Sequence, residues 1–122
     1  MIRIVGVQPS ENIGQEFVLL QNQGNMRVNL RGHALVAEDS LLDPPGLQRV
    51  FVINQDVDIP AGHHVAIRTG SGDHQWCHKH DGYHIYHFFL NRGESLWDSQ
   101  STLMLLAPNH RFTPRKVETL LV

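Results

Sequence analysis

The sequence predicts an all-β fold, a β-sandwich or barrel built from short strands. Apolar runs of a few residues alternate with turns rich in Gly, Pro, Asn and Asp about every 8–12 residues, which is typical of such folds. No stretch keeps a sustained apolar period of about 3.6 residues, so long amphipathic helices are not expected. A chain of 122 residues, 41% hydrophobic and 18% charged, suits one globular domain, residues 1–122, with one core.

The first strands organise the rest of the predicted fold. Residues 2–7 are apolar and β-branched, and the polar run 9–12 ends them. Residues 15–22 are apolar on both faces, which favours a central strand. A turn at Gly24 leads into a third strand, residues 27–37, in which Gly32 predicts a bend. We expect residues 15–35 to form a hairpin around which the domain is built.

The second half of the chain continues the pattern of strands and turns. In residues 63–69, Val65 and Ile67 share one face, while His64, Ala66 and Arg68 share the other. Residues 38–48 contain Asp-Pro-Pro-Gly and predict a loop. Further strands are expected at residues 49–54, 56–60, 85–90 and 101–107, with a last strand or tail at 112–122.

Alternating apolar side chains from these strands supply the candidate core. We expect Phe17 and Trp97 at its centre, because large aromatic rings contribute the most apolar area. The candidate core residues are Phe17, Leu19, Leu30, Leu35, Phe51, Val65, Ile67, Trp97, Leu103 and Leu105.

The charge balance argues against a nucleic-acid partner at neutral pH. The formal net charge is −2, so no basic field attracts phosphates. Nine histidines would change this to −2 + 9 = +7 if all were protonated. Weak DNA binding in mild acid is therefore one alternative function, with a small basic cluster at Arg111, Arg115 and Lys116.

A single cysteine and the lack of a long apolar run bear on location. Cys77 has no partner for an intramolecular disulfide, which fits a reducing compartment. The N-terminal residues 1–12 contain no apolar stretch long enough for a secretory signal or a membrane span. We expect a cytoplasmic protein, if the chain is complete, with no membrane partner.

Four segments in order resemble the lamin-tail domain family. They are GQEFVLLQN (residues 14–22), VNLRGHAL (28–35), IPAGHHVAIRTG (59–70) and NRGESLWDSQSTLMLL (91–106). The chain is similar to a small stand-alone member of the bacterial type. It departs from the family at residues 98–102, which lack the usual glycine, and residues 74–84 have no counterpart there.

The resemblance implies an immunoglobulin-like β-sandwich that binds rather than catalyses. The family has no catalytic constellation, so no active-site residue is carried over and an enzyme is not expected. We expect a binding or assembly module for protein–protein contact, with self-association included. The aromatic run at residues 83–89 and the tail at 120–122 are candidate contact surfaces.

The histidine-rich segment at residues 74–87, HQWCHKHDGYHIYH, carries the alternative chemistry. Thiolate and imidazole are the ligands that zinc prefers. A zinc site would draw on Cys77, His78, His80, His84 and His87. The competing interpretation is a solvated loop that is rich in histidine. A nucleophilic role for Cys77 is not expected, because no Gly-rich oxyanion turn follows it.

Overall fold

A computed structural model describes residues 1–37, 50–78, 82, 84–95, 97 and 102–108, and the regular secondary structure of these residues is almost all β. One turn of 3₁₀ helix, η1(Ile13–Gln15), precedes the second strand. The described strands are β1(Ile2–Gln8), β2(Phe17–Asn22), β3(Val28–Asn29), β4(Ala34–Ala37), β5(Val50–Val52), β6(Asp58–Ile59), β7(His64–Arg68), β8(Gln75–His78), β9(His84–Phe89) and β10(Leu103–Leu106). The prediction of an all-β fold is confirmed.

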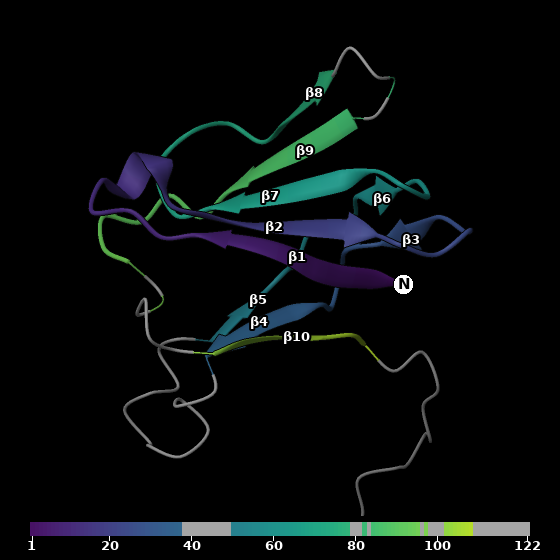
Figure 1. Ribbon diagram of the computed structural model, residues 1–122, viewed down its shortest axis with the longest axis horizontal. Helices are drawn as coiled ribbons and strands as arrows, with labels where there is room; N and C mark the ends of the chain where they lie inside the picture. The colour runs from purple at the N-terminus through teal and green to yellow at the C-terminus, as the bar shows by residue number, and fades with distance from the viewer. Residues whose placement is uncertain (38–49, 79–81, 83, 96, 98–101, 109–122) are drawn as a thin grey trace, which may run out of the picture.

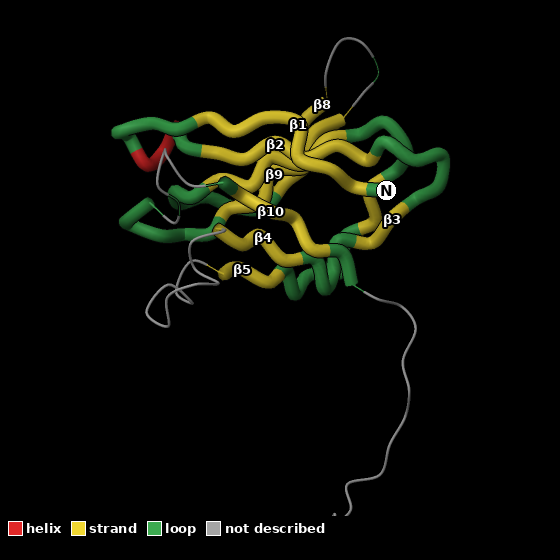
Figure 2. The backbone as a smooth tube through the Cα atoms, turned by 60° about the horizontal axis from the view of Figure 1, so that its bottom comes forward, coloured by secondary structure: helices red, strands yellow, loops and turns green. Residues whose placement is uncertain are grey.

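The strands form sheets of five, three and two strands (Figure 1). The large sheet has the order β1-β2-β7-β9-β8, and the smaller ones are β10-β4-β5 and β3-β6. β7 and β9 run parallel, and the other pairs are antiparallel. The chain reaches β8 before β9, so the returning β9 is inserted between β7 and β8. Figure 2 shows the large sheet lying over β4, β5 and β10.

The predicted hairpin at residues 15–35 is wrong, although its first strand is central as expected. β2 pairs with β1 on one edge and β7 on the other, so neither edge is left for the third strand. That third strand is split at Gly32, whose φ is 88°, and His33 N donates to Leu30 O at 3.1 Å across the turn. β3 then pairs with β6, and β4 pairs with β5 and β10. The bend predicted at Gly32 sends the two halves into different sheets.

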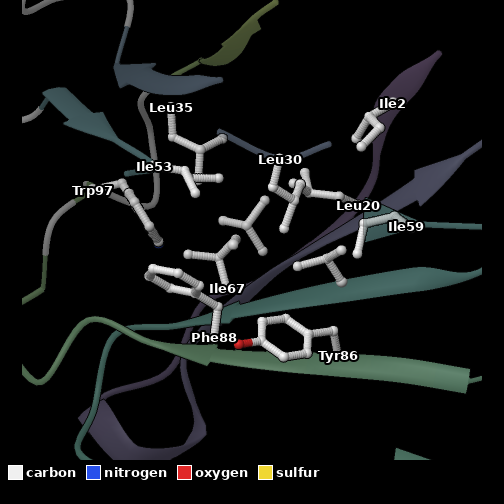
Figure 3. Packing of buried hydrophobic residues seen from close by; sticks show 12 residues of the cluster. Ile2, Leu20, Leu30, Leu35, Ile53, Ile59, Ile67, Tyr86, Phe88 and Trp97 are labelled. Atoms are coloured by element: carbon white, nitrogen blue, oxygen red, sulfur yellow. The ribbon is translucent and has the colours of Figure 1, made fainter. Parts of the chain in front are cut away.

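The core lies between the large sheet and the two smaller ones (Figure 3). From β2, Val18 and Leu20 point into it and are fully buried, opposite Ile67 and Val65 of β7. Phe17 is therefore not a central packing residue: strand alternation puts it and Leu19 on the outer face, where both are half-buried. Trp97 does join the core, as predicted.

The strands predicted in the second half are found close to their expected positions. β5, β6, β7 and β10 lie within the expected ranges, and β9 begins one residue before its expected range of 85–90. Leu30, Leu35, Val65 and Ile67 are buried as predicted, and Phe51, Leu103 and Leu105 pack against the core while partly exposed. The expected loop at residues 38–48 and the strand or tail at 112–122 lie outside the described residues, as does the candidate surface at 120–122.

Candidate functional site at the β8–β9 edge

The histidine-rich segment forms two strands at the edge of the large sheet. β8 pairs with β9 in the register Gln75–His87, Trp76–Tyr86, Cys77–Ile85 and His78–His84. The interpretation of residues 74–87 as a solvated loop is therefore wrong for the described part of the segment. Both strands gain a hydrogen-bonded neighbour in the sheet. Among the described strands, β8 is the last of the sheet on this side, and its outer edge is called the free edge.

The direction of the backbone groups along this edge follows from two hydrogen bonds. Leu90 N donates to Arg68 O at 2.8 Å, so the even-numbered residues of β9 turn their backbone groups toward β7. Phe89 N donates toward the β8 side, to the ring of His74. The odd-numbered residues of β9 therefore bond to Gln75 and Cys77 of β8. The backbone N–H and C=O of Trp76 and His78 point away from the sheet, at its free edge.

The pleat separates the predicted zinc ligands. His84 lies on the inner face with Tyr86, whereas His87 and Cys77 lie on the outer face. The Cα of His78 is paired with that of His84, and His80 lies outside the described residues. Among the described residues no group of three or more His, Cys, Asp or Glu is arranged to hold a metal. Zinc binding by this segment stays a prediction.

Three rings gather at the inner face of the sheet's free end. His63, just before β7, stacks on His84 with ring centroids 5.0 Å apart and an interplanar angle of 17°. Trp76 stands edge-on to both, with its ring centroid 6.4 Å from each imidazole. It also lies 5.2 Å from the Tyr86 ring, measured between centroids. Trp76 is 37% exposed, so this cluster reaches the surface.

His74 and Phe88 continue the ring cluster toward the core. Their rings stack at 4.3 Å between centroids. Phe88 in turn meets Phe51 of β5 edge-to-face at 5.8 Å. A row of aromatic and imidazole rings therefore runs from the exposed Trp76 down to the packed contact between the sheets.

Two of these imidazoles accept backbone hydrogen bonds. Nδ1 of His63 accepts from His84 N at 3.1 Å, and Nδ1 of His74 accepts from Phe89 N at 2.9 Å. An imidazole nitrogen accepts only when it carries no proton. Both rings are therefore held in the form whose proton sits on Nε2. They complete the backbone pairing at the two ends of β9.

The outer face of the sheet centres on Arg68. Its Nε donates to Nδ1 of His87 at 2.9 Å, and its guanidinium lies 5.2 Å from the centroid of the Phe17 ring. Burial lowers the pKa of His87, and the positive charge of Arg68 lowers it further. On the inner face, burial raises the pKa of Tyr86, whose hydroxyl donates to Gln55 Oε1 at 3.3 Å.

Two buried polar side chains hold the ends of β2. Glu16, 3% exposed, accepts hydrogen bonds of 2.5 Å from Thr69 Oγ1 and from Ser95 Oγ. Asn22, fully buried, donates from Nδ2 to the carbonyls of Met26 and Ile59, both at 2.8 Å. These groups are satisfied within the fold, so they are structural.

Sequence reasoning missed Trp76, His63 and His74 as members of one cluster. The period-two spacing of His74, Trp76 and His78, matched by His84, Tyr86 and Phe88, indicates two ring-bearing strand faces. His63 has no such pattern, because only the pairing of β7 with β9 brings it to the site.

Comparison of the chain with protein-family models, with curated protein sequences and with solved structures finds no match. In the part of the chain that the structure describes, no helix has the length and apolar character needed to cross a membrane.

Proposed function

We propose that this chain is a non-catalytic protein-binding module of the lamin-tail type, an immunoglobulin-like β-sandwich that takes an extended protein segment on the free edge of β8. The observation that supports the proposal most strongly is the set of outward backbone groups along the free edge of β8. Trp76 and His78 direct their backbone donors and acceptors outward, and the Trp76 ring is partly exposed beside them. An added strand would satisfy those groups, and its side chains would meet the ring cluster.

The positions of the resemblance motifs support the lamin-tail assignment. Glu16 and Asn22 of GQEFVLLQN anchor the two ends of β2. Gly32 of VNLRGHAL and Gly62 of IPAGHHVAIRTG have φ of 88° and 83°, which glycine adopts without strain. Motif residues thus occupy positions where the fold needs that residue type. This is expected if they specify a shared scaffold.

A protein partner fits this edge better than a nucleic acid does. Gln75, Trp76 and Cys77 carry no charge, and the whole chain has a formal charge of −2. The charge-neutralising phosphate contacts that dominate nucleic-acid affinity come mainly from Lys and Arg. A β-edge instead offers alternating N–H and C=O groups, which another peptide backbone complements.

The proposal is tested with short peptides selected from a displayed random library on the immobilised protein. We expect bound peptides to protect the amides of Trp76 and His78 from hydrogen exchange. Trp76→Pro removes the outward N–H and should abolish binding, because proline cannot donate to a ladder. Trp76→Ala keeps that N–H and should only weaken binding.

Two results would overturn this assignment. One is selection of no peptide that binds in solution. The other is peptide binding that Trp76→Pro and Trp76→Ala reduce equally, since that would locate the contact in the side chain and not in the edge.

A further inference from the structure

The two edges of the large sheet differ in how well they can accept a strand. β1, at one edge, has a register shift between Ile4 and Gly6 and lies next to β10. Such a bulge twists an edge and disfavours pairing. β8, at the other edge, pairs with β9 without a shift, and both Figure 1 and Figure 2 place it away from β10. β8 is thus the regular edge of the sheet.

We infer that a second copy of this chain pairs with β8, the two β8 strands lying antiparallel about a two-fold axis at Cys77. The inference rests on the proposed function and names the partner. An antiparallel edge is its own complement, because each outward residue offers one donor and one acceptor. The outward residues of β8 are Trp76 and His78, and their midpoint is Cys77.

This register satisfies every outward backbone group of β8. Trp76 of one copy exchanges two hydrogen bonds with His78 of the other copy, and the symmetric pair does the same. A register centred on Trp76 would pair Trp76 with its own copy and leave the outward groups of His78 beyond the other β8. Gln75, Trp76 and Cys77 carry no charge, so two copies meet there without like-charge repulsion.

The same register places the two Cys77 residues directly opposite one another. They form a pair without backbone hydrogen bonds, in which Cα atoms lie about 4.5 Å apart. A disulfide accepts Cα separations of about 4.4–6.8 Å. Cys77 is exposed, and both copies of its side chain would stand on the outer face of the joined sheet. The rate of disulfide formation between the two Cys77 thiols therefore tests the proposed register.

The first experiment measures covalent dimer formation with oxidised glutathione as the oxidant. One Cys77 thiolate displaces glutathione to give a mixed disulfide. The second Cys77 thiolate then attacks the Cys77 sulfur of that mixed disulfide. Two thiols become one disulfide, and two reduced glutathiones leave.

The matched control is the double variant Gln75→Cys/Cys77→Ser, which moves the thiol two residues along the same exposed face. We expect the native thiol to cross-link at least about tenfold faster, because only Cys77 faces its own copy. Equal rates, or a faster control, would overturn the two-fold register.

The second experiment measures the non-covalent dimer by sedimentation equilibrium of the reduced protein. Cys77→Ser should still dimerise, since the edge and not the thiol makes the contact. Cys77→Lys should be monomeric, because it places two like charges opposite one another. Gln75→Lys, on the same face, should weaken the dimer less. Positions 75 and 77 are both exposed, so neither substitution is expected to prevent folding.

The outcomes separate this inference from the proposed function. If the reduced native chain and Cys77→Ser stay monomeric at all concentrations, the inference fails. If selected peptides still bind that monomer and Trp76→Pro abolishes their binding, the proposed function stands. Dimerisation that Cys77→Lys and Gln75→Lys reduce equally also contradicts the two-fold axis at Cys77.

Discussion

The inner face of the large sheet is aliphatic on β2 and β7 but aromatic and imidazole-rich on β9 and β8. Val18, Leu20, Val65 and Ile67 are all fully buried beneath the smaller sheets. On β9 and β8 the same face carries His84, Tyr86, Phe88 and Trp76, and exposure rises toward the edge.

The difference shows that the covered half and the exposed half of one sheet use different kinds of side chain. Aliphatic chains contribute burial without polar atoms that need partners, so they suit the covered half. Rings with nitrogen or hydroxyl groups combine an apolar body with a polar end. They therefore suit the half of the sheet that packs against the core at one end and is exposed to solvent at the other. We expect substitutions in the first half to cost the most stability, and those in the second half to cost less stability and to change local contacts and the pH dependence of stability.

The largest expected effect is from Leu20→Ala in the aliphatic half. Leu20 is 0% exposed, so truncation removes buried apolar contacts and leaves a cavity. We expect the free energy of unfolding to fall by about 2–5 kcal/mol. Chemical denaturation measures it. Leu19→Ala, the neighbour on the half-buried outer face, is the matched control, and a loss as large as that of Leu20→Ala would contradict the assignment of faces.

A smaller loss is expected from Asn22→Ala at the end of β2. The change leaves the carbonyls of Met26 and Ile59 without their amide donor, and Ile59 is fully buried. We expect a loss of about 2–3 kcal/mol. Asn29→Ala removes two exposed hydrogen bonds, one from Asn29 Nδ2 to Asp58 Oδ1 and one from Arg31 N to Asn29 Oδ1, and should cost well under half as much. Equal losses in thermal unfolding would show that Asn22 is not a buried anchor.

In the ring-bearing half, the two roles of His74 can be separated. His74→Phe keeps the stack on Phe88 but leaves Phe89 N without its acceptor, which should cost about 1 kcal/mol. His74→Asn keeps an acceptor oxygen near the Nδ1 position but loses the stack. Hydrogen exchange of the Phe89 amide should accelerate in the Phe variant and change less in the Asn variant. The reverse order would refute the capping role.

The smallest expected effect is a pH dependence from His87. Its pKa is lowered from 6.5 in the folded chain, so the unfolded chain takes up the proton first as pH falls. The contribution of His87 to stability is therefore full above about pH 6.5 and is lost as pH falls through the folded pKa.

His87→Gln tests this contribution. Urea unfolding between about pH 7.5 and about pH 5.5 should show a shallower loss for the variant than for the native chain. The difference between the two curves removes the shared titration of the other histidines. Parallel curves of unfolding free energy against pH would show that burial and Arg68 do not lower the pKa of His87.

Local patterns predicted most strands, although not β8, and predicted the partners of those strands poorly. The alternation in residues 63–69 identified the buried Val65 and Ile67 correctly, because side chains on a strand alternate whatever it pairs with. The hairpin at residues 15–35 failed because β1 and β7 occupy both edges of β2. Phe17 was misplaced for a related reason: both faces of β2 are apolar, and only the smaller sheets decide which is covered.

The sequence predicted several residues of the candidate site, but not how the strands and faces of the sheet arrange them. The sequence marked residues 74–87 as unusual and proposed Cys77, His84 and His87 as neighbours. The pleat places His84 on the opposite face from the other two. The ring cluster depends on His63, which lies eleven or more residues away from every other member and reaches them only through sheet pairing.

The sequence by itself determined the all-β character, the positions of most strands other than β8, and the bend at Gly32. These depend on side-chain alternation and on backbone φ values, which each short segment carries within itself. Only the tertiary structure decided that β9 is inserted beside β7 and that β8 is left as the free edge. Strand pairing joins residues far apart in the chain, and the choice among partners depends on the free energy of the whole core.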